Sequence, residues 1–200
     1  MLNKRRSLGW GILMSRSPVI IALLDANVLY PAPLRDYLLH LAMLGVFEPI
    51  WTAAIQDEWI RNLVKARPDL NRAALETTQR SMDSAFPGSN VADYESIIES
   101  LSLPDPDDRH VLAAAIKSKA DVIVTANLKD FPSHALTPYG IRAEHPDVFV
   151  SACIDRERQK AIKALKNQVK ALRKPPLPLE KVLENLESSG LVKSVVKLRP

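Results

Sequence analysis

Four acidic residues that are far apart in the sequence could come together to form a catalytic site in an α/β protein: Asp25, Glu58, Asp108 and Asp130. Asp25 directly follows an apolar run of strand length, and open α/β sheets place their ligand sites at the carboxyl ends of such strands. Carboxylates that crowd together repel one another and stay ionised only when a cation neutralises them. Mg²⁺ or Mn²⁺ suits an all-oxygen site and activates water for phosphodiester hydrolysis. The four residues therefore predict a divalent-metal site with hydrolytic chemistry.

Each of these residues also has a simpler interpretation when it is considered alone. Asp25 could close an Asx-turn after its strand, and Glu58 could be an ordinary solvated helix residue. Either Asp107 or Asp108 could serve only as a helix N-cap, although the helical register favours Asp108 as the one that points inward. The shared placement of the four carboxylates at loops that converge favours the metal site.

Neutral polar residues close to the acidic ones could support them. Asn27 and Asn127 could orient a carboxylate or hold a metal-bound water, and Thr125 could do the same through its hydroxyl. Other chemistries find no pattern here. The four histidines lack metal-ligand spacing, so we expect them to be structural or solvated. The six glycines form no phosphate-binding loop, and no Ser-His-Asp arrangement stands out.

Strands and helices alternate along the first three quarters of the chain. We expect strands at residues 19–24, 47–51 and 121–125, with a short edge element at 140–143. Helices are expected at residues 34–46, 53–66, 70–85 and 93–101, from Asp108 onward, and from Pro146. These spacings predict βαβ units and a mainly parallel sheet with right-handed crossovers.

The last fifty residues are helical and basic. Residues 155–174 are expected to form one amphipathic helix with apolar side chains at Ile162, Leu165, Val169 and Leu172. A proline-rich spacer then ends this helix, and a last short helix at 179–187 and an apolar segment at 191–198 follow it.

Composition describes a globular chain with an uneven charge distribution. Its 200 residues are 46% hydrophobic and 25% charged, with a formal net charge of +4. Residues 1–17 carry four basic and no acidic residues, whereas residues 18–150 have a net charge of −7 and residues 151–200 of +7. An acidic body suits a site that gathers carboxylates for a cation, and a basic C-terminal part suits an anionic partner.

The remaining sequence features bound the location and the domain organisation. The single Cys153 favours a reducing, cytoplasmic setting. No apolar run reaches membrane-spanning length, so no membrane partner is expected, and the basic start lacks a signal-peptide cleavage site. Met14 could be the start as readily as Met1. We expect a poorly ordered extension at 1–17, one α/β domain at 18–152 and a helical extension at 153–200.

Three motifs together resemble one family of nucleases. Asp-x-Asn-Val-Leu follows the first strand, Asp-Asp-Arg-His-Val-Leu-Ala-Ala-Ala-Ile begins at residue 107, and Val-Thr-x-Asn-x-x-Asp-Phe begins at residue 124. This ordered set resembles PIN-domain ribonucleases, in particular the VapC-type toxins of type II toxin–antitoxin systems. The resemblance covers about residues 18–152, and the Pro-Leu-Pro-Leu-Glu-Lys-Val-Leu segment is similar to an extension carried by some of these toxins.

The resemblance implies a fold, an activity and partners. The fold would be a PIN-like three-layer α/β fold with a helical C-terminal extension, and the activity would be a Mg²⁺-dependent RNA endonuclease. Asp25, Glu58 and Asp108 match the acidic positions of the family, while either Asp130 or Asn127 completes the set. A homodimer and a cognate antitoxin that blocks the site are also implied.

Basic side chains of the C-terminal helix have two interpretations. They could guide RNA phosphates or dock an acidic antitoxin segment, or they could form only a solvated face. The residues concerned are Arg156, Arg158, Lys163, Lys166 and Lys170.

Two other functions are compatible with parts of this pattern. A phosphatase of the Asp-x-Asp type needs a second aspartate two residues after the nucleophile, and position 27 is Asn. A non-catalytic RNA- or protein-binding module on a nuclease-like fold would not need all four acidic groups. The sequence therefore predicts a metal-dependent endoribonuclease.

Overall fold

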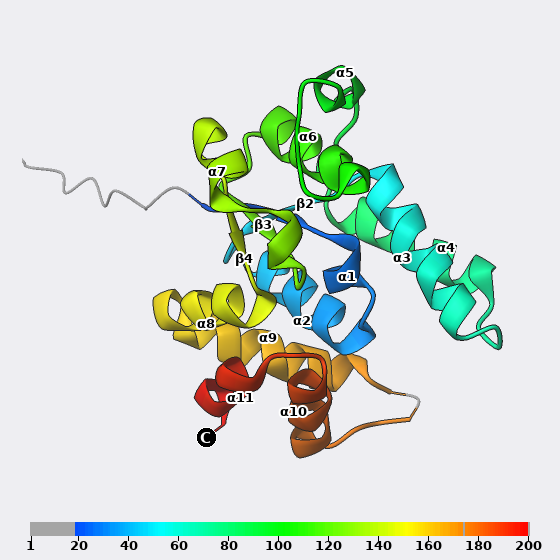
Figure 1. Cartoon of the computed structure of the whole chain (residues 1–200). Coiled ribbons are helices and arrows are strands. Elements are labelled where there is room, and N and C mark those ends of the chain that lie inside the picture. Colours follow the sequence, from blue (N-terminus) through cyan, green and yellow to red (C-terminus); the bar gives the residue numbers. More distant parts are fainter. Residues whose placement is uncertain (1–18, 174, 200) are drawn as a thin grey trace, which may run out of the picture.

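The computed structural model describes residues 19–173 and 175–199. The predicted extension at residues 1–17, with the choice between Met1 and Met14, lies outside the described residues, as does Lys174. Figure 1 shows a central sheet with helices around it and a helical C-terminal part to one side.

Four parallel strands form the sheet in the order β2-β1-β3-β4. The strands are β1 (Ile21–Leu24), β2 (Glu48–Ile50), β3 (Val122–Val124) and β4 (Arg142–Glu144). Both central strands are continuous apolar runs, as expected of parallel strands that are covered on both faces. Leu24 pairs with Val124 at the carboxyl ends of β1 and β3, so the residues that follow these two strands emerge side by side.

Helices cover both faces of this sheet. Figure 1 shows α6 (Arg109–Ser118) on one face and α2 (Ala32–Met43) on the other. The prediction of a three-layer α/β fold with a mainly parallel sheet is confirmed, and every strand pairing in the described part is parallel. The shorter helical elements are α1 (Ala26–Leu29), α5 (Glu95–Ile98), α7 (Ser133–Leu136), η1 (Pro106–Asp108), η2 (Leu128–Asp130) and η3 (Thr137–Tyr139).

Local capping residues explain where the longer helices begin. The Thr52 hydroxyl accepts a hydrogen bond from the Ile55 amide at the start of α3 (Ala53–Ala66), as its place before the helix predicts. Asn71 does the same for α4 (Arg72–Ala85). α2 begins two residues before the expected position, because Pro33 fits the first turn of a helix instead of breaking the chain there.

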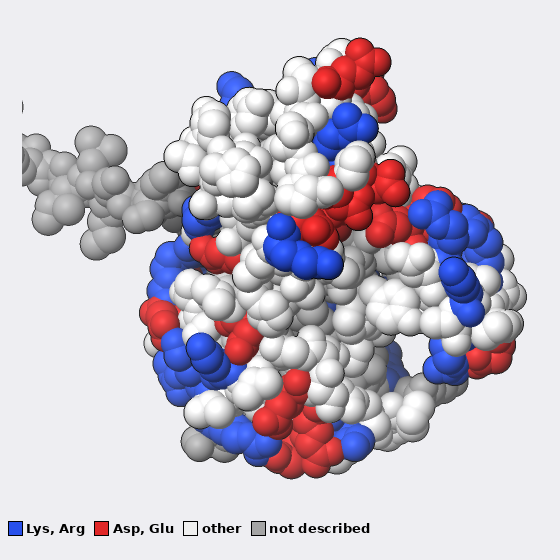
Figure 2. Space-filling model, viewed as in Figure 1, with Lys and Arg blue, Asp and Glu red and all other residues white. Residues whose placement is uncertain are grey.

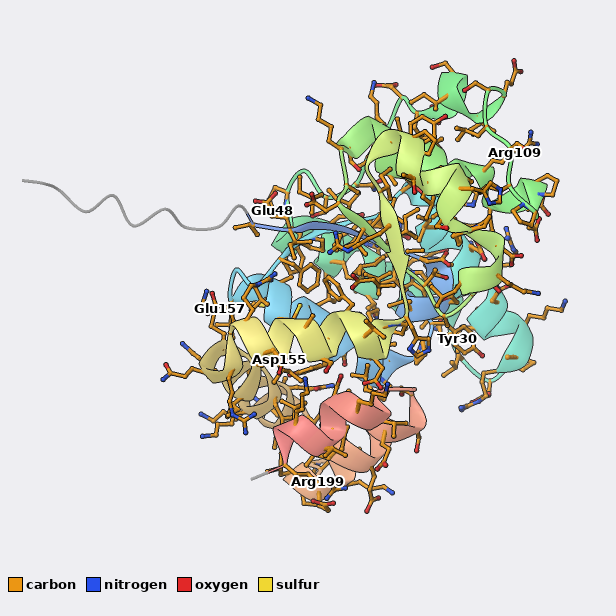
Figure 3. All side chains as sticks on the ribbon, turned by 60° about the vertical axis from the view of Figure 1, so that its left-hand side comes forward. Tyr30, Glu48, Arg109, Asp155, Glu157 and Arg199 are labelled. Carbon is orange, nitrogen blue, oxygen red and sulfur yellow. The ribbon has the colours of Figure 1, made fainter. Side chains whose placement is uncertain are left out.

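The C-terminal part contains four helices: α8 (Pro146–Arg156), α9 (Arg158–Ala171), α10 (Leu179–Ser188) and α11 (Val192–Leu198). The prediction of one helix over 155–174 is wrong at its start, because Glu157 leaves the helical conformation with φ −137° and ψ 51°. This break turns the chain between Asp155 and Glu157 (Figure 3) and lets α9 pack against α2. The predicted boundary between residues 152 and 153 lies within α8.

Contacts with α8 and with each other hold the last two helices in place. The buried Asp147 carboxylate of α8 accepts hydrogen bonds from the amides of Lys193 and Ser194, at 2.9 and 2.8 Å, at the start of α11. The Ser194 hydroxyl donates a further bond of 2.7 Å to the same carboxylate. At the other end of α11, Arg199 pairs with Glu180 of α10 (Figure 3). The segment expected to be merely apolar is therefore a docked helix.

Throughout the described ranges, no helix combines the length and the apolar character that a membrane crossing requires.

Candidate active site

Asp25 is fixed at the carboxyl end of β1 by both its backbone and its side chain. Its amide donates to the Val124 carbonyl of the neighbouring strand at 3.1 Å. Its carboxylate accepts hydrogen bonds from the amide of Ala26 at 2.7 Å and from the Thr125 hydroxyl at 2.7 Å. The residue is 4% exposed. Burial raises the pKa of Asp25, and the hydrogen bond from Thr125 opposes that rise.

Asn27 and Thr125 link the ends of the two central strands. The Asn27 amide nitrogen donates to the Asp25 carboxylate at 2.5 Å and to the Thr125 hydroxyl at 3.0 Å. The Asn27 carbonyl oxygen accepts from the Ala126 amide at 2.9 Å, and the Thr125 hydroxyl accepts from the Asn127 amide at 3.0 Å. This network holds Asp25 in one orientation, which is the geometry that the supporting role predicted for Asn27 and Thr125 requires.

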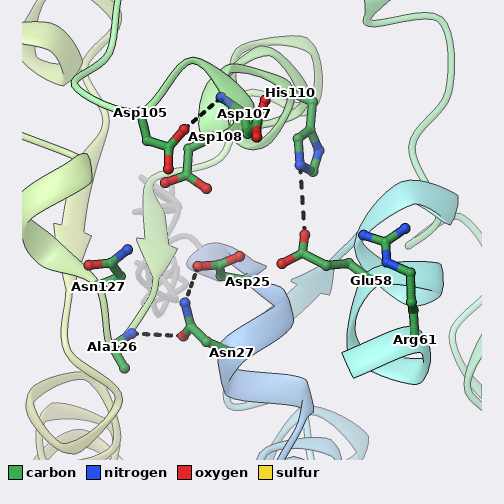
Figure 4. Close-up of a pocket in the computed structure, with 10 residues that line it drawn as sticks. All are labelled: Asp25, Asn27, Glu58, Arg61, Asp105, Asp107, Asp108, His110, Ala126 and Asn127. Carbon is green, nitrogen blue, oxygen red and sulfur yellow. Dashed lines mark hydrogen bonds and ion pairs between the residues drawn. The ribbon is translucent and has the colours of Figure 1, made fainter. Parts of the chain in front are cut away.

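Glu58 reaches the same place from α3. The close-up in Figure 4 shows its carboxylate facing Asp25 across the pocket. The imidazole Nε2 of His110 lies 3.9 Å from the Glu58 carboxylate. Burial and the charge of Asp25 raise the pKa of Glu58. The side chain is 35% exposed and faces the other carboxylates, so the interpretation as an ordinary solvated residue is not what the geometry favours.

Asp108 lies at the junction of η1 and α6, close to the other acidic groups. Burial and, after it, the charges of Asp25, Asp105, Asp130 and Glu58 together raise the pKa of Asp108 to about 7. Its side chain makes no capping hydrogen bond. The cap of η1 is instead Asp105, whose carboxylate accepts from the Asp107 amide at 2.9 Å. Asp108 therefore occupies the N-cap position of α6 without capping the helix through its side chain, because the chain enters the helix through a 3₁₀ turn.

Asp130 and Asn127 both belong to the loop that follows β3. Asp130 is buried at 8% exposure, and the Asn127 amide nitrogen donates a hydrogen bond to its carboxylate. One carboxylate oxygen from each of Asp105, Asp108 and Asp130 lies within 4.8 Å of the others. Asn127 therefore contacts Asp130 and also lines the pocket. The two residues predicted as alternatives for the fourth position of the acidic site are thus hydrogen-bonded to each other.

Asp25, Glu58 and Asp108 line a pocket of about 700 Å³, whereas Asp130 and Thr125 are not among its lining residues. Figure 2 shows the acidic patch at this place, with basic side chains on either side of it. The carboxylate and amide groups of the pocket come from the residues just after β1, from α3, from η1 with the residue before it, and from the loop after β3. Its lining consists of Asp25, Asn27, Glu58, Arg61, Asp105, Asp107, Asp108, His110, Ala126 and Asn127.

Five lining residues were not predicted as part of the site: Arg61, Asp105, Asp107, His110 and Ala126, of which Asp107 was considered only as the alternative to Asp108. Asp105 stands in the same acidic run as Asp108, and that run is the signal that could have included it. Arg61 lies one helical turn after Glu58 and therefore shares its face of α3. His110 follows Asp108 by two residues, and its other ring nitrogen, Nδ1, is buried without a hydrogen-bond partner among the described atoms.

The five basic residues predicted to bind nucleic acid do not line this pocket. Arg156 donates to the Val46 carbonyl at 2.6 Å, and Arg158 donates to the Lys197 carbonyl at 3.0 Å. Both guanidinium groups therefore have contacts within the fold. Lys163, Lys166 and Lys170 are exposed on α9.

Comparisons with known proteins agree with the sequence motifs. Residues 22–129 match the family model described as "PIN domain", and residues 146–200 match the model described as "VapC50 C-terminal domain". The curated protein "Putative ribonuclease VapC50" of Mycobacterium tuberculosis (strain ATCC 25618 / H37Rv) is 44% identical over 79 residues. That alignment covers 40% of this chain and 47% of the relative, so it spans about half of the relative's length. No solved structure matches the chain.

Proposed function

Because the chain belongs to the PIN-domain family, we propose that it is an endoribonuclease that depends on a divalent metal ion. The observation that carries the proposal is the convergence of Asp25, Glu58 and Asp108 in one pocket, with Asp130 beside Asp108. The name of the ribonuclease relative supports RNA as the substrate class. The catalytic residues in this proposal are Asp25, Glu58, Asp108 and Asp130.

The donor set of the pocket fits Mg²⁺ or Mn²⁺. The converging groups are carboxylates, which are the hard oxygen ligands that these ions prefer. Burial, together with the charges of the neighbouring carboxylates, raises the pKa of Asp108 to about 7, so a bound cation would stabilise the ionised form of this group. When bound, the ion would polarise a water and stabilise the charge that develops on the phosphate.

Neighbouring side chains of the protein would hold these carboxylates in a fixed orientation. Thr125 and Asn27 donate to the Asp25 carboxylate and leave it unable to rotate freely. Asn127 does the same for Asp130. Arg61 is the basic residue in the lining, and its guanidinium could meet an RNA phosphate at the rim. Its ion pair with Asp57, at 3.1 Å, is exposed and therefore easily exchanged.

RNA cleavage by the purified chain tests this proposal directly. With Mg²⁺ present, the wild-type chain should cut RNA, and EDTA should stop the reaction. Asp25→Asn and Asp108→Asn should abolish cleavage while circular dichroism shows a folded protein. Asp155→Asn, which changes an exposed aspartate at the α8–α9 junction, serves as the matched control and should cut normally. Normal cleavage by both pocket variants would refute the assignment.

Metal binding separates this function from the alternative of a non-catalytic module. Calorimetric titration of the wild-type chain with Mn²⁺ should show saturable binding that Asp108→Asn weakens. If the wild-type chain neither binds Mn²⁺ nor cuts RNA, an RNA- or protein-binding module becomes the better description.

We propose a biological setting on the same grounds. The match of residues 146–200 to the VapC50 C-terminal domain supports a toxin of a toxin–antitoxin pair that acts in the cytoplasm as a homodimer. We keep the division into a nuclease domain at 18–152 and an extension at 153–200 as part of this proposal. Induced expression should arrest growth, the Asp108→Asn variant should not, and the product of a neighbouring reading frame should relieve the arrest and co-purify. Light scattering of the purified chain measures its oligomeric state.

The exposed lysines of α9 keep their predicted role in this proposal. Lys163, Lys166 and Lys170 share one exposed face of a helix outside the pocket, where they could contact RNA phosphates or an acidic antitoxin segment. Arg156 and Arg158 are weaker candidates, because both guanidinium groups donate to backbone carbonyls.

A further inference from the structure

Arg35 is a charged residue that the proposed chemistry does not use, although it is buried at 6% exposure. It lies on α2 and does not line the pocket. Its Nε atom is buried without a hydrogen-bond partner among the described atoms. An ion pair with the neighbouring Asp36, at 3.8 Å, offsets part of the cost of burying this guanidinium, and the two contacts that it makes with other helices indicate why the residue stands there.

The first contact is with α1, the short helix that Asp25 begins. Arg35 Nη1 donates a hydrogen bond of 2.8 Å to the Leu29 carbonyl at the end of α1. The Asp25 side chain accepts from the first amide of the same helix. A helix of four residues has little stability of its own, so an outside contact at its end restrains the position of the whole element, including Asp25.

The second contact is with α3, the helix that carries Glu58. The guanidinium carbon of Arg35 lies 4.6 Å from the centroid of the Trp59 ring, which is a cation–π arrangement. Trp59 is fully buried and donates a hydrogen bond of 2.6 Å to Gln56 of the same helix. Since Glu58 precedes Trp59 directly, a shift of the indole would move the Glu58 backbone with it.

We propose that Arg35 is a positioning residue that sets the spacing between the Asp25 and Glu58 carboxylates by joining α1 to α3. This inference rests on the proposed metal-dependent function. Figure 4 shows the two carboxylates facing each other across the pocket, each on one of the joined elements. A planar guanidinium donates in its plane and stacks through its face at the same time, whereas a lysine ammonium cannot do both.

The sign of the effect on metal affinity separates this role from a purely electrostatic one. Arg35 carries a positive charge, so its removal would strengthen the binding of a cation if its charge alone mattered. If Arg35 acts by positioning, its removal loosens the carboxylates and weakens the binding. The two explanations therefore predict opposite changes for Arg35→Met.

The experiment compares Mn²⁺ affinity in four full-length proteins by calorimetry. The proteins are the wild type, Arg35→Met, Arg35→Lys and the control Tyr37→Phe. Tyr37 lies on α2, as Arg35 does, and Tyr37→Phe removes the buried hydrogen bond that its hydroxyl donates to the Ala161 carbonyl of α9. All four are measured at a temperature at which circular dichroism shows them to be folded. We expect about tenfold weaker binding for Arg35→Met, an intermediate loss for Arg35→Lys and no change for Tyr37→Phe.

A second pair of variants keeps the test decisive if Arg35→Met does not fold. Trp59→Phe retains an aromatic face for the guanidinium, and Trp59→Leu does not. Both shorten the same buried side chain, but only Trp59→Leu should weaken Mn²⁺ binding strongly. Unchanged or tighter binding by the folded Arg35 variants, or equal binding by the two Trp59 variants, would overturn the inference while leaving the proposed function intact. Absence of Mn²⁺ binding in the wild type would overturn both.

Discussion

Asp108→Asn should make the metal-free protein more stable at neutral and alkaline pH. The Asp108 carboxylate is half-buried among other acidic groups, and its pKa is raised from 3.8 to about 7. Below about pH 4 the group is protonated in both the folded and the unfolded chain, so it costs nothing there. Above about pH 7 the group is charged in both states, and its burial among other carboxylates then lowers the free energy of unfolding by the full amount. The penalty therefore grows between these two pH values.

The size of this penalty follows from the change in pKa. Each pKa unit corresponds to about 1.4 kcal/mol, so the rise from 3.8 to about 7 would amount to about 4 kcal/mol if it were fully expressed. Asp108 is partly exposed, and solvent screening reduces such values strongly. We therefore expect Asp108→Asn to gain about 1–2 kcal/mol at pH 8, which corresponds to a rise in Tm of about 2–8 °C for a chain of this size.

Thermal denaturation with EDTA at pH 4 and at pH 8 measures this effect. Asp108→Asn should exceed the wild type at pH 8 and match it at pH 4, while Asp155→Asn should show no such dependence. Addition of Mg²⁺ at pH 8 should raise the Tm of the wild type and remove most of the difference. If Asp108→Asn is no more stable than the wild type at pH 8, burial and the neighbouring carboxylates do not disfavour the charged form of Asp108, and the prediction is wrong.

Other parts of the structure lead to three further predictions. Replacement of Lys163, Lys166 and Lys170 together by Ala, in a cleavage-deficient background, should lower the slope of log affinity against log salt for single-stranded RNA by up to about two, which fluorescence anisotropy measures. An unchanged slope would assign these lysines to solvent or to a protein partner. Arg156→Ala should cost about 1–2 kcal/mol in chemical denaturation, because it removes a hydrogen bond to the Val46 carbonyl, and it should leave the RNA slope unchanged. Burial alone would raise the pKa of Asp147, but hydrogen bonds from Ser194 and from the Lys193 amide lower it below its usual value. The docking of α11 should therefore weaken as the pH falls through that lowered pKa, seen as faster amide exchange in α11, and Asp147→Asn should show this exchange already at neutral pH.

The sequence was sufficient to predict the acidic residues that follow strands. Asp25 stands directly after a continuous apolar run, and register in a parallel sheet then brings it beside the end of β3. Asp105 and His110 could not be assigned in this way, because their positions depend on a 3₁₀ turn at Pro106–Asp108. The hydrophobic pattern of α6 is the same with or without that turn, so periodicity alone places only the helix.

The C-terminal part shows a different limit of sequence reasoning. Of the apolar positions predicted by periodicity, Leu165 is buried and Val169 and Leu172 pack partly buried against the core, while Ile162 is only half-buried and Leu172 lies just after the end of α9. Periodicity could not locate the break at Glu157, because the residues on both sides of it are good helix formers, and the packing of α9 on α2 that accompanies the break is a tertiary contact. Charge counting likewise included Arg156 and Arg158 among the free basic residues, since contacts with backbone carbonyls leave no trace in composition.

The order of the pocket residues along the chain has a consequence for the chain during its synthesis on the ribosome. The Thr125 hydroxyl that holds the Asp25 carboxylate lies 100 residues further along the chain. The hydrogen bond from the Asp25 amide to the Val124 carbonyl can likewise form only after β3 has been synthesised. A nascent chain that has emerged only through α4 contains Asp25 and Glu58 but has no Asp108 and no β3. Truncated translation products of that length would thus be harmless to RNA, and the destructive chemistry would begin only after the central strands have met.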